Sequence, residues 1–266
     1  FRSSLGGANT FYNTNVNNVT FASWTFRKAA KFFDVVTYTG NGSNNRTVSH
    51  NLGSTPGCII VKRTDQASSI GWAVYHRSSG NLCLNTTDAE NNAFNGDVTS
   101  PTSTTFTVSS YTDVNANGGT YVAYLFAHNA GGFGAAGTDN VISCGSYTGN
   151  GSATGPTITL GYEPQWVLIK QATSGGTRWT VTDNMRGFPV ISSAGQQILQ
   201  PNTTDADIGV MYIQPTSTGF KVVDTDPDVN TNSSTYIYIA IRRGPMKTPR
   251  SEEHTSELQS PYVISY

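Results

Sequence analysis

Apolar residues occur along this chain in short runs that are bounded by glycine, asparagine, threonine and proline. Gly57–Lys62 contains the continuous run Cys-Ile-Ile-Val, and Tyr121–Ala127 is apolar throughout, which is typical of strands buried on both faces. Gly71–His76 alternates and therefore predicts a strand with one buried face. No segment keeps a helical periodicity, because glycine and proline interrupt every candidate. The pattern predicts an all-β protein.

The predicted strands occur in the same order in the two halves of the chain. Those of the first half are Val35–Tyr38, Arg46–His50, Gly57–Lys62, Gly71–His76, Phe106–Val108 and Tyr121–Ala127. Those of the second half are Trp166–Lys170, Arg178–Thr182, Gly219–Val223 and Tyr236–Ile241. Several short strands in about one hundred residues, separated by turns, indicate a β-sandwich. We therefore expect two tandem β-sandwich domains.

The two halves also share sequence motifs, as expected for one folding unit used in series. The corresponding segments are Tyr38–Ser43 with Tyr147–Ser152, Leu52–Lys62 with Leu160–Lys170, Trp72 with Trp179, Asn85–Ala89 with Asn202–Ala206, and Asp113–Val122 with Asp228–Ile237. The matching segments predict a common framework, and the insertions between them predict surface loops. Serial units are more common in extended binding and structural proteins than in compact enzymes, so internal duplication favours such a role.

Composition shifts predict the domain boundaries. Residues 31–129 form the first expected sandwich, and residues 140–249 form the second. Residues 130–139 are glycine-rich and predict a linker. Residues 1–30 predict a lead-in strand and a partial third copy, because Asn15–Arg27 is similar to the end of the first unit. The parent protein is therefore expected to extend beyond the N-terminus of this chain.

Residues 250–266 differ from the rest of the chain. Arg250–Ser260 resembles the in-frame translation of a standard sequencing adapter over successive residues, and Ile264–Tyr266 resembles its continuation. We interpret residues 250–266 as a non-native tail that is excluded from the fold.

Charge and cysteine content narrow the function classes. Charged residues are 12% of the chain and the formal net charge is −1, so no basic stripe points to nucleic acid as a partner. No apolar run is long enough to cross a membrane as a helix. Cys58, Cys83 and Cys144 lack metal-ligand spacing and are interpreted as apolar filling rather than as a disulfide framework.

The sequence gives little evidence for catalytic groups. His50, His76 and His128 have no histidine at the corresponding place in the second unit, and no partner is recognisable that would make any of them a base. Structural roles are therefore expected for them. Asp224–Asp228 resembles a calcium loop only superficially, because the glycine and glutamate of an EF-hand are missing, so a solvated turn is favoured. No catalytic residue, cofactor or metal site is predicted.

Four acidic residues remain as binding candidates. Asp88 and Glu90 in the first unit correspond to Asp205 and Asp207 in the second. Two carboxyls per unit are compatible with glycoside hydrolysis, although the capping of turns by asparagine and aspartate explains the same residues. Trp72 and Trp179 occupy matching strand positions, where core packing is favoured over a sugar-stacking platform.

Several motifs resemble a repeat domain of tailed-bacteriophage virion proteins that is widespread in marine phage sequences. They are Ser23–Lys28, Phe33–Gly42, His50–Gly57, Ile60–Arg63 and Asn117–Phe126 in the first unit, with Leu160–Trp166 and Ile239–Lys247 in the second. The resemblance covers residues 15–249 and implies a tail fibre or related appendage, without catalytic residues to carry over.

The leading hypothesis is a non-enzymatic virion protein whose loops attach to a bacterial surface glycan. The expected partners are other virion proteins, and a homo-oligomer is plausible. The alternatives are a glycan-degrading depolymerase module and a purely architectural decoration of the capsid or tail.

Overall fold

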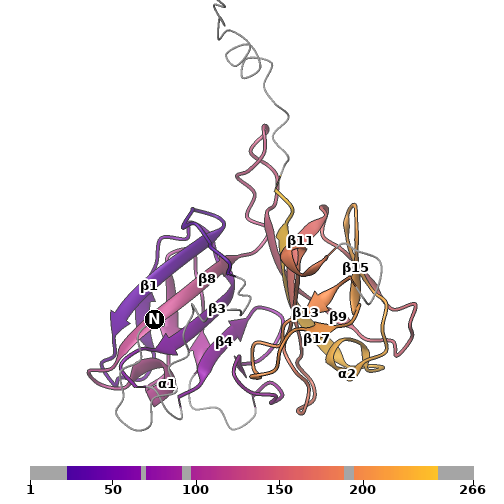
Figure 1. Cartoon of the computed structure of the whole chain (residues 1–266). Coiled ribbons are helices and arrows are strands. Elements are labelled where there is room, and N and C mark those ends of the chain that lie inside the picture. The colour runs from indigo at the N-terminus through magenta and orange to yellow at the C-terminus, as the bar shows by residue number, and fades with distance from the viewer. Residues whose placement is uncertain (1–22, 67–69, 92–96, 189–194, 245–266) are drawn as a thin grey trace, which may run out of the picture.

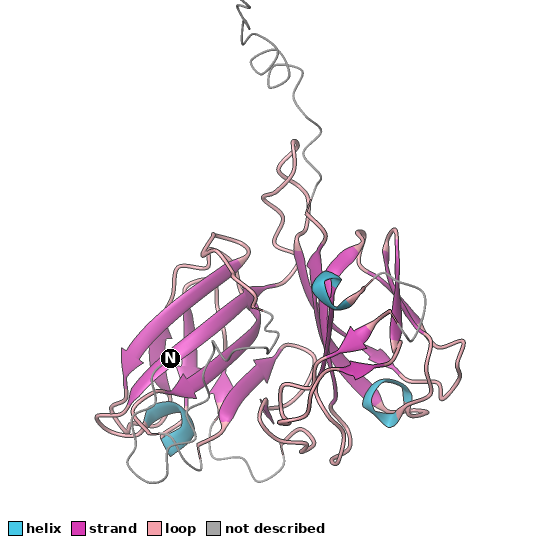
Figure 2. Ribbon diagram, viewed as in Figure 1, coloured by secondary structure: helices cyan, strands magenta, loops and turns pink. Residues whose placement is uncertain are grey.

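The computed structural model describes residues 23–66, 70–91, 97–188 and 195–244 (Figure 1). Within these residues the protein is all-β, with antiparallel sheets, two single-turn α-helices and one 3₁₀ turn (Figure 2). The expected all-β class is therefore confirmed. The tail at 250–266 and residues 1–22 lie outside the described residues.

The first unit is a sandwich of a larger and a smaller sheet. The larger sheet has the order β1 (Phe33–Thr39), β8 (Thr120–Ala127), β3 (Pro56–Arg63), β4 (Trp72–His76) and β5 (Leu82–Cys83). The smaller sheet has the order β2 (Arg46–Ser49), β7 (Thr105–Val108) and β6 (Val98–Thr99). A single-turn helix, α1 (Thr112–Asn115), precedes β8. Phe106 and Leu125, both fully buried, belong to the core of this unit.

The second unit has a similar arrangement, with four strands instead of five in its larger sheet. Its larger sheet has the order β9 (Ile142–Thr148), β17 (Thr235–Arg242), β11 (Pro164–Gln171) and β12 (Thr180–Asp183). Its smaller sheet has the order β10 (Thr157–Thr159), β16 (Gly219–Val222) and β15 (Ile213–Thr216). A further pair, β13 (Gln197–Ile198) and β14 (Ile208–Gly209), follows the 3₁₀ turn η1 (Asn184–Arg186), and α2 (Pro227–Asn230) precedes β17. The shared strand order is what the repeated sequence leads us to expect, while duplication as its origin stays a prediction.

The repeated Tyr-Thr-Gly-Asn-Gly-Ser motif ties the first strand of each unit to the helix that precedes the last strand. The Tyr38 hydroxyl donates to the Val114 carbonyl at 2.6 Å, and in the second unit the Tyr147 hydroxyl donates to Val229 at 2.8 Å. The glycine is required because a Cβ at Gly40 would collide with the Ala116 carbonyl. The motif therefore links segments of each unit that are far apart in the sequence.

The larger sheets of the two units pack against each other. The outer face of β3 and β4 meets the outer face of β11, β12 and β17, so that both units contribute to one continuous apolar cluster. The residues that meet are Cys58, Ile60, Val74 and His76 of the first unit and Leu168, Trp179, Ile237 and Ile239 of the second. The two sandwiches therefore share a core and form one body.

Hydrogen bonds across this junction satisfy the polar groups that the packing buries. The Trp179 indole donates to the Cys83 carbonyl at 3.0 Å, and His76 Nε2 bonds the Tyr238 carbonyl at 3.1 Å. The Lys170 ammonium, fully buried, donates to Thr177 at 2.9 and 3.0 Å and to Thr87 at 3.4 Å. Burial lowers the pKa of Lys170 to about 8. Trp179 thus packs as expected, but between the units.

Two segments depart from a simple tandem picture. Residues 23–28, expected to continue a lead-in strand, have no regular secondary structure, because their side chains pack between the two units instead of pairing with a sheet edge. The expected linker at 130–139 is a loop closed by a bridge between Phe133 and Asp139, and Asp139 also pairs with Arg242 at 2.9 Å.

The two tryptophans offer a matched test of the junction. Trp179 is 2% exposed, whereas Trp72 is half-buried and lies beneath the Lys62 ammonium at 5.6 Å from its ring. We expect Trp179→Ala to lower the free energy of unfolding by about 3–5 kcal/mol and Trp72→Ala to lower it by less than half as much. Denaturant titration of both variants measures the difference, and equal losses would contradict the assigned junction.

Acid is expected to destabilise the protein through His76. Burial, opposed by the bond to Tyr238, lowers its pKa to about 4, so the folded state resists the proton that the unfolded state takes up near pH 6.5. The unfolding free energy should fall by about 3 kcal/mol between pH 6.5 and 4 from this group alone. Denaturant titrations of His76→Gln at both pH values should show a shallower fall, and an unchanged slope would refute the assignment.

Candidate functional site

The first predicted acidic pair lies at the junction of the units. Glu90 accepts a hydrogen bond from the Gly80 amide through its carboxylate, and its own amide donates to the Ala172 carbonyl of the second unit at 2.8 Å. In the same loop, the Thr87 carbonyl accepts from the Gly176 amide at 2.9 Å. Asp88 is part of this loop, which holds the two units together.

The second predicted pair lies in the second unit, in the connection between β13 and β14. The Asp207 carboxylate pairs with the Arg186 guanidinium at 2.9 Å, and Arg186 also pairs with Asp183 at 2.6 Å. Asp205 is exposed, and its amide donates to the Thr203 hydroxyl at 3.2 Å. None of the four predicted carboxylates lines either of the cavities described below.

Asp226 caps α2, whereas Asp228 is buried and makes a tertiary bond, so the expected solvated turn is wrong for Asp228. The Asp226 carboxylate accepts from the Asp228 amide at 2.8 Å, and Asp228 accepts from the Arg178 amide at 2.7 Å. Across the described part of the chain, no three His, Cys, Asp or Glu side chains are placed to hold a metal ion. In the same ranges, no helix is long and apolar enough to span a membrane.

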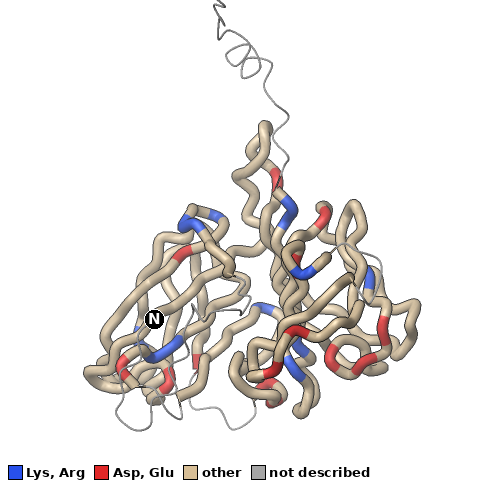
Figure 3. The backbone as a smooth tube through the Cα atoms, viewed as in Figure 1, with Lys and Arg blue, Asp and Glu red and all other residues tan. Residues whose placement is uncertain are grey.

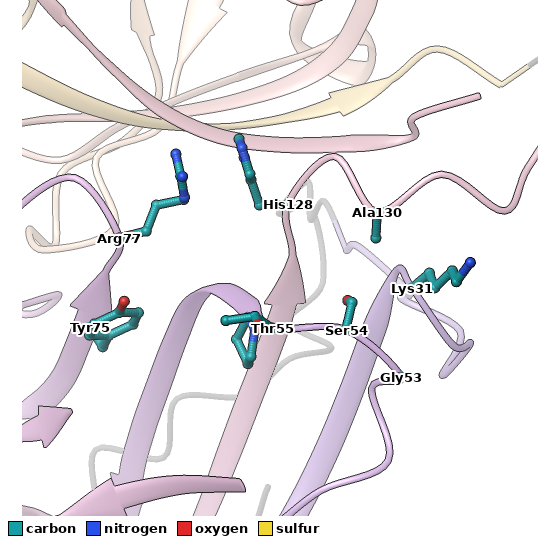
Figure 4. Close-up of a pocket in the computed structure, with 9 residues that line it drawn as sticks. Lys31, Gly53, Ser54, Thr55, Tyr75, Arg77, His128 and Ala130 are labelled. Atoms are coloured by element: carbon teal, nitrogen blue, oxygen red, sulfur yellow. The ribbon is translucent and has the colours of Figure 1, made fainter. Parts of the chain in front are cut away.

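A cavity of about 480 Å³ opens at the strand ends on one side of the first unit's larger sheet, next to the second unit (Figure 4). Antiparallel pairing places the starts of β1 and β3 and the ends of β4 and β8 on this side. The residues so gathered include Lys31, Ser54, Thr55, Tyr75, Arg77 and His128. The volume lies within the roughly 300–1,000 Å³ that is usual for small-molecule sites.

His128 presents a fixed donor to this cavity. Its Nδ1 accepts from the Cys144 amide at 3.1 Å, which leaves the proton of the neutral ring on Nε2. Burial, and then the positive charge of Arg77, lower the pKa of His128, so the ring is neutral at pH 7. Within the described residues Nε2 has no protein partner, and it remains available to a ligand.

The cations of this cavity are not neutralised by the protein. Most lysines and arginines pair with a carboxylate or a carbonyl, including Lys28 with Asp34 at 2.7 Å. Over the ranges the structure describes, the side chains that make no ion pair or hydrogen bond are those of Arg27, Lys31, Arg77 and Lys221. Two of these four line the cavity, which also contains no carboxylate. Elsewhere positive and negative residues are interspersed (Figure 3).

Hydroxyl groups complete the lining. Ser54 Oγ has no hydrogen-bond partner among the described residues but is inaccessible to solvent, whereas the Thr55 side chain is exposed. Burial raises the pKa of Tyr75, so its hydroxyl keeps its proton. Figure 4 shows Arg77 and His128 extending in the same direction from the strand ends, with Lys31 at the opposite end of the cavity.

The corresponding side of the second unit is closed. In the repeat alignment Ser54 corresponds to Tyr162, whose hydroxyl donates to the Ala240 carbonyl at 2.9 Å within the packed interior. Thr55 corresponds to Glu163, which pairs with Arg243 at 2.8 Å. The small residues of the first unit therefore leave open a space that a tyrosine and an ion pair occupy in its counterpart.

A second cavity, of about 260 Å³, is aromatic. It lies where the segment at 23–26 meets β11 and η1, and it is lined by Trp24, Phe26, Trp166, Met185 and the last strand at Ile241, among others. The Trp24 indole donates to Asp183 at 3.0 Å, and the Arg186 guanidinium lies 4.8 Å from the Trp24 ring. Trp166 Nε1 is buried and has no hydrogen-bond partner within the described ranges. These contacts fix the segment on the second unit.

A family model matches residues 4–245, which include both sandwiches and the segment that precedes them. The chain belongs to the DUF7483 family. That family is described as a domain of unknown function. No curated protein and no solved structure matches the chain.

Sequence reasoning missed the open cavity of this DUF7483 domain. Lys31, Arg77 and His128 belong to loops that are distant in the chain and share no motif. The available signal was the repeat itself, because Ser54 and Thr55 are small where the second unit carries Tyr162 and Glu163.

Unfolding free energies of variants distinguish the roles of the acidic candidates. We expect Glu90→Ala to lower the unfolding free energy of the DUF7483 domain by about 1.5–3 kcal/mol, because a charge-assisted bond to the Gly80 amide is lost. Asp205→Ala, at an exposed position, should change it by less than about 0.5 kcal/mol. Thermal and denaturant unfolding provide the comparison, and an unaffected Glu90→Ala variant would argue against an anchoring role.

Proposed function

We propose that this protein is a non-enzymatic attachment protein of a tailed-bacteriophage virion. The two fused sandwiches act as a rigid carrier, and the open cavity of the first unit receives part of a bacterial surface glycan. Other virion proteins are the expected assembly partners. The virion context rests on the sequence resemblance, whereas the binding role rests on the site.

The observation that carries the binding role is the set of unpaired donors around one cavity. Arg77, Lys31 and His128 Nε2 have no protein acceptor in the described residues, and Ser54 adds a buried hydroxyl without a partner. Arg77 and Lys31 are exposed, so water solvates both charges in the free protein. A ligand rich in oxygen acceptors can replace this water and bind several of the donors at once. Saccharides supply such acceptors in high density.

The depolymerase alternative has weaker support. Glycoside hydrolysis needs two carboxyls facing each other across the scissile bond. Glu90 and Asp207 are engaged with Gly80 and Arg186, and the cavity itself is lined by cations and hydroxyls. These contacts favour binding without hydrolysis.

Binding of the full chain to marine bacterial cells and to their extracted surface glycans tests the proposal. We expect saturable, strain-selective binding that Arg77→Gln weakens about tenfold or more, since a charge-assisted contact is lost. Lys221→Gln removes another unpaired cation, outside the cavity, and should bind as the unsubstituted chain does.

Absence of binding across a panel that includes the host would overturn the attachment role and favour an architectural spacer. Clearing of the glycan by the chain, measured as release of reducing ends, would instead favour the depolymerase.

A further inference from the structure

The charges of the open cavity are divided between its two ends. Arg77 and His128 lie side by side at one end, and Lys31 lies at the other, with Ser54 and Thr55 between them (Figure 4). We infer that the ligand is an acidic saccharide chain with a carboxylate on successive sugar residues. This inference rests on the proposed glycan-binding function and specifies its chemistry.

The Arg77 end has the geometry of an anion site. A guanidinium offers a planar fork of N–H donors that fits the two oxygens of a carboxylate, and it is always charged. The neutral His128 ring adds one N–H on Nε2, while its Nδ1 is held by the Cys144 amide. A neutral sugar hydroxyl would leave the guanidinium charge uncompensated, whereas a carboxylate neutralises it.

The Lys31 end supplies a second positive charge in a fixed place. Lys31 has a left-handed backbone conformation with φ of 63°, and its amide donates to the Leu52 carbonyl at 2.6 Å. Its aliphatic stem lies against Gly132, where a Cβ would come within 2.9 Å of the Lys31 Cδ. The loop at 130–139 thus helps to position this ammonium.

The space between the two ends suits the body of a sugar. Thr55 contributes an exposed hydroxyl, and the half-buried Tyr75 ring contributes an apolar surface with a protonated hydroxyl. A chain with anionic groups on neighbouring residues engages both ends at once, so its second contact forms at a high effective concentration.

The second unit gives an internal comparison. There Glu163, in place of Thr55, pairs with Arg243, so the protein supplies its own carboxylate to a cation on the equivalent side. In the first unit the position is left to Thr55, and the carboxylate has to come from a ligand.

Titration of the full chain with tetragalacturonate, followed by calorimetry, tests the inference. Its fully methyl-esterified form is the neutral control, and monomeric galacturonate reports on chain length. We expect the tetramer to bind about tenfold more tightly than the monomer and the ester to bind about tenfold more weakly or not at all.

Substitutions test which residues bind the ligand at each end of the cavity. Arg77→Gln and Thr55→Glu should each weaken tetramer binding about tenfold, and Arg77→Lys should restore only part of it because an ammonium lacks the fork. Lys31→Gln should abolish the difference in affinity between tetragalacturonate and monomeric galacturonate. His128→Gln, which keeps a neutral donor, should bind better than His128→Ala. Lys221→Gln should leave binding unchanged.

Equal affinity for the acid and the ester, or no binding to either, would overturn the acidic ligand. Binding of extracted host glycans in that case would leave the proposed attachment function intact. Dextran sulfate is a control for non-specific binding of polyanions. If it binds as tightly as tetragalacturonate, and if Arg77→Gln does not weaken its binding, the inferred acidic saccharide ligand is also overturned. Preference for oligomeric glycerol phosphate over tetragalacturonate would overturn the carboxylate ligand and assign phosphate to the anion site instead.

Discussion

The architecture depends on burying the outer face of the second unit's larger sheet. In an isolated sandwich this face would be exposed, yet Leu168, Ile237 and Ile239 are each at most 5% exposed. Among the described residues, the first unit covers these side chains. At about 25 cal/mol per Å² of apolar surface, such burial is a dominant stabilising term. The polar bonds of His76, Trp179 and Lys170 then fix one relative orientation.

The sequence predicted the regular parts of the fold because their signals are local. Gly57–Lys62 and Tyr121–Ala127 are strong apolar runs, and they form β3 and β8 at the centre of a sheet. Ile142–Thr148 was not predicted, because Ser143 to Ser146 show no apolar alternation. It is a strand because β17 pairs with it along its whole length. The two-residue strands likewise have no pattern of their own and depend on tertiary pairing.

Most of the candidate site could not be predicted from the sequence. The four acidic candidates share a repeated motif, but Asp88 and Glu90 lie in a loop that anchors the junction, and Asp207 pairs with Arg186. The cavity residues are gathered by the antiparallel order of β1, β8, β3 and β4, which no local pattern encodes. What marks the site is the lack of partners for Arg77 and Lys31, and this becomes visible only when every other side chain has been placed.

The aromatic cavity has a consequence for how the body is connected. Ser23 and Ile241 line the same cavity, so the chain path enters and leaves the described structure on one side of the second unit. Tension between these two points would not pass through the sandwiches in series. It would act on the contacts of Trp24 and Phe26 with the second unit, and on those of Phe26 with Phe33 and Phe126 of the first. The first unit would therefore carry part of the load, at the strand ends that also border the open cavity.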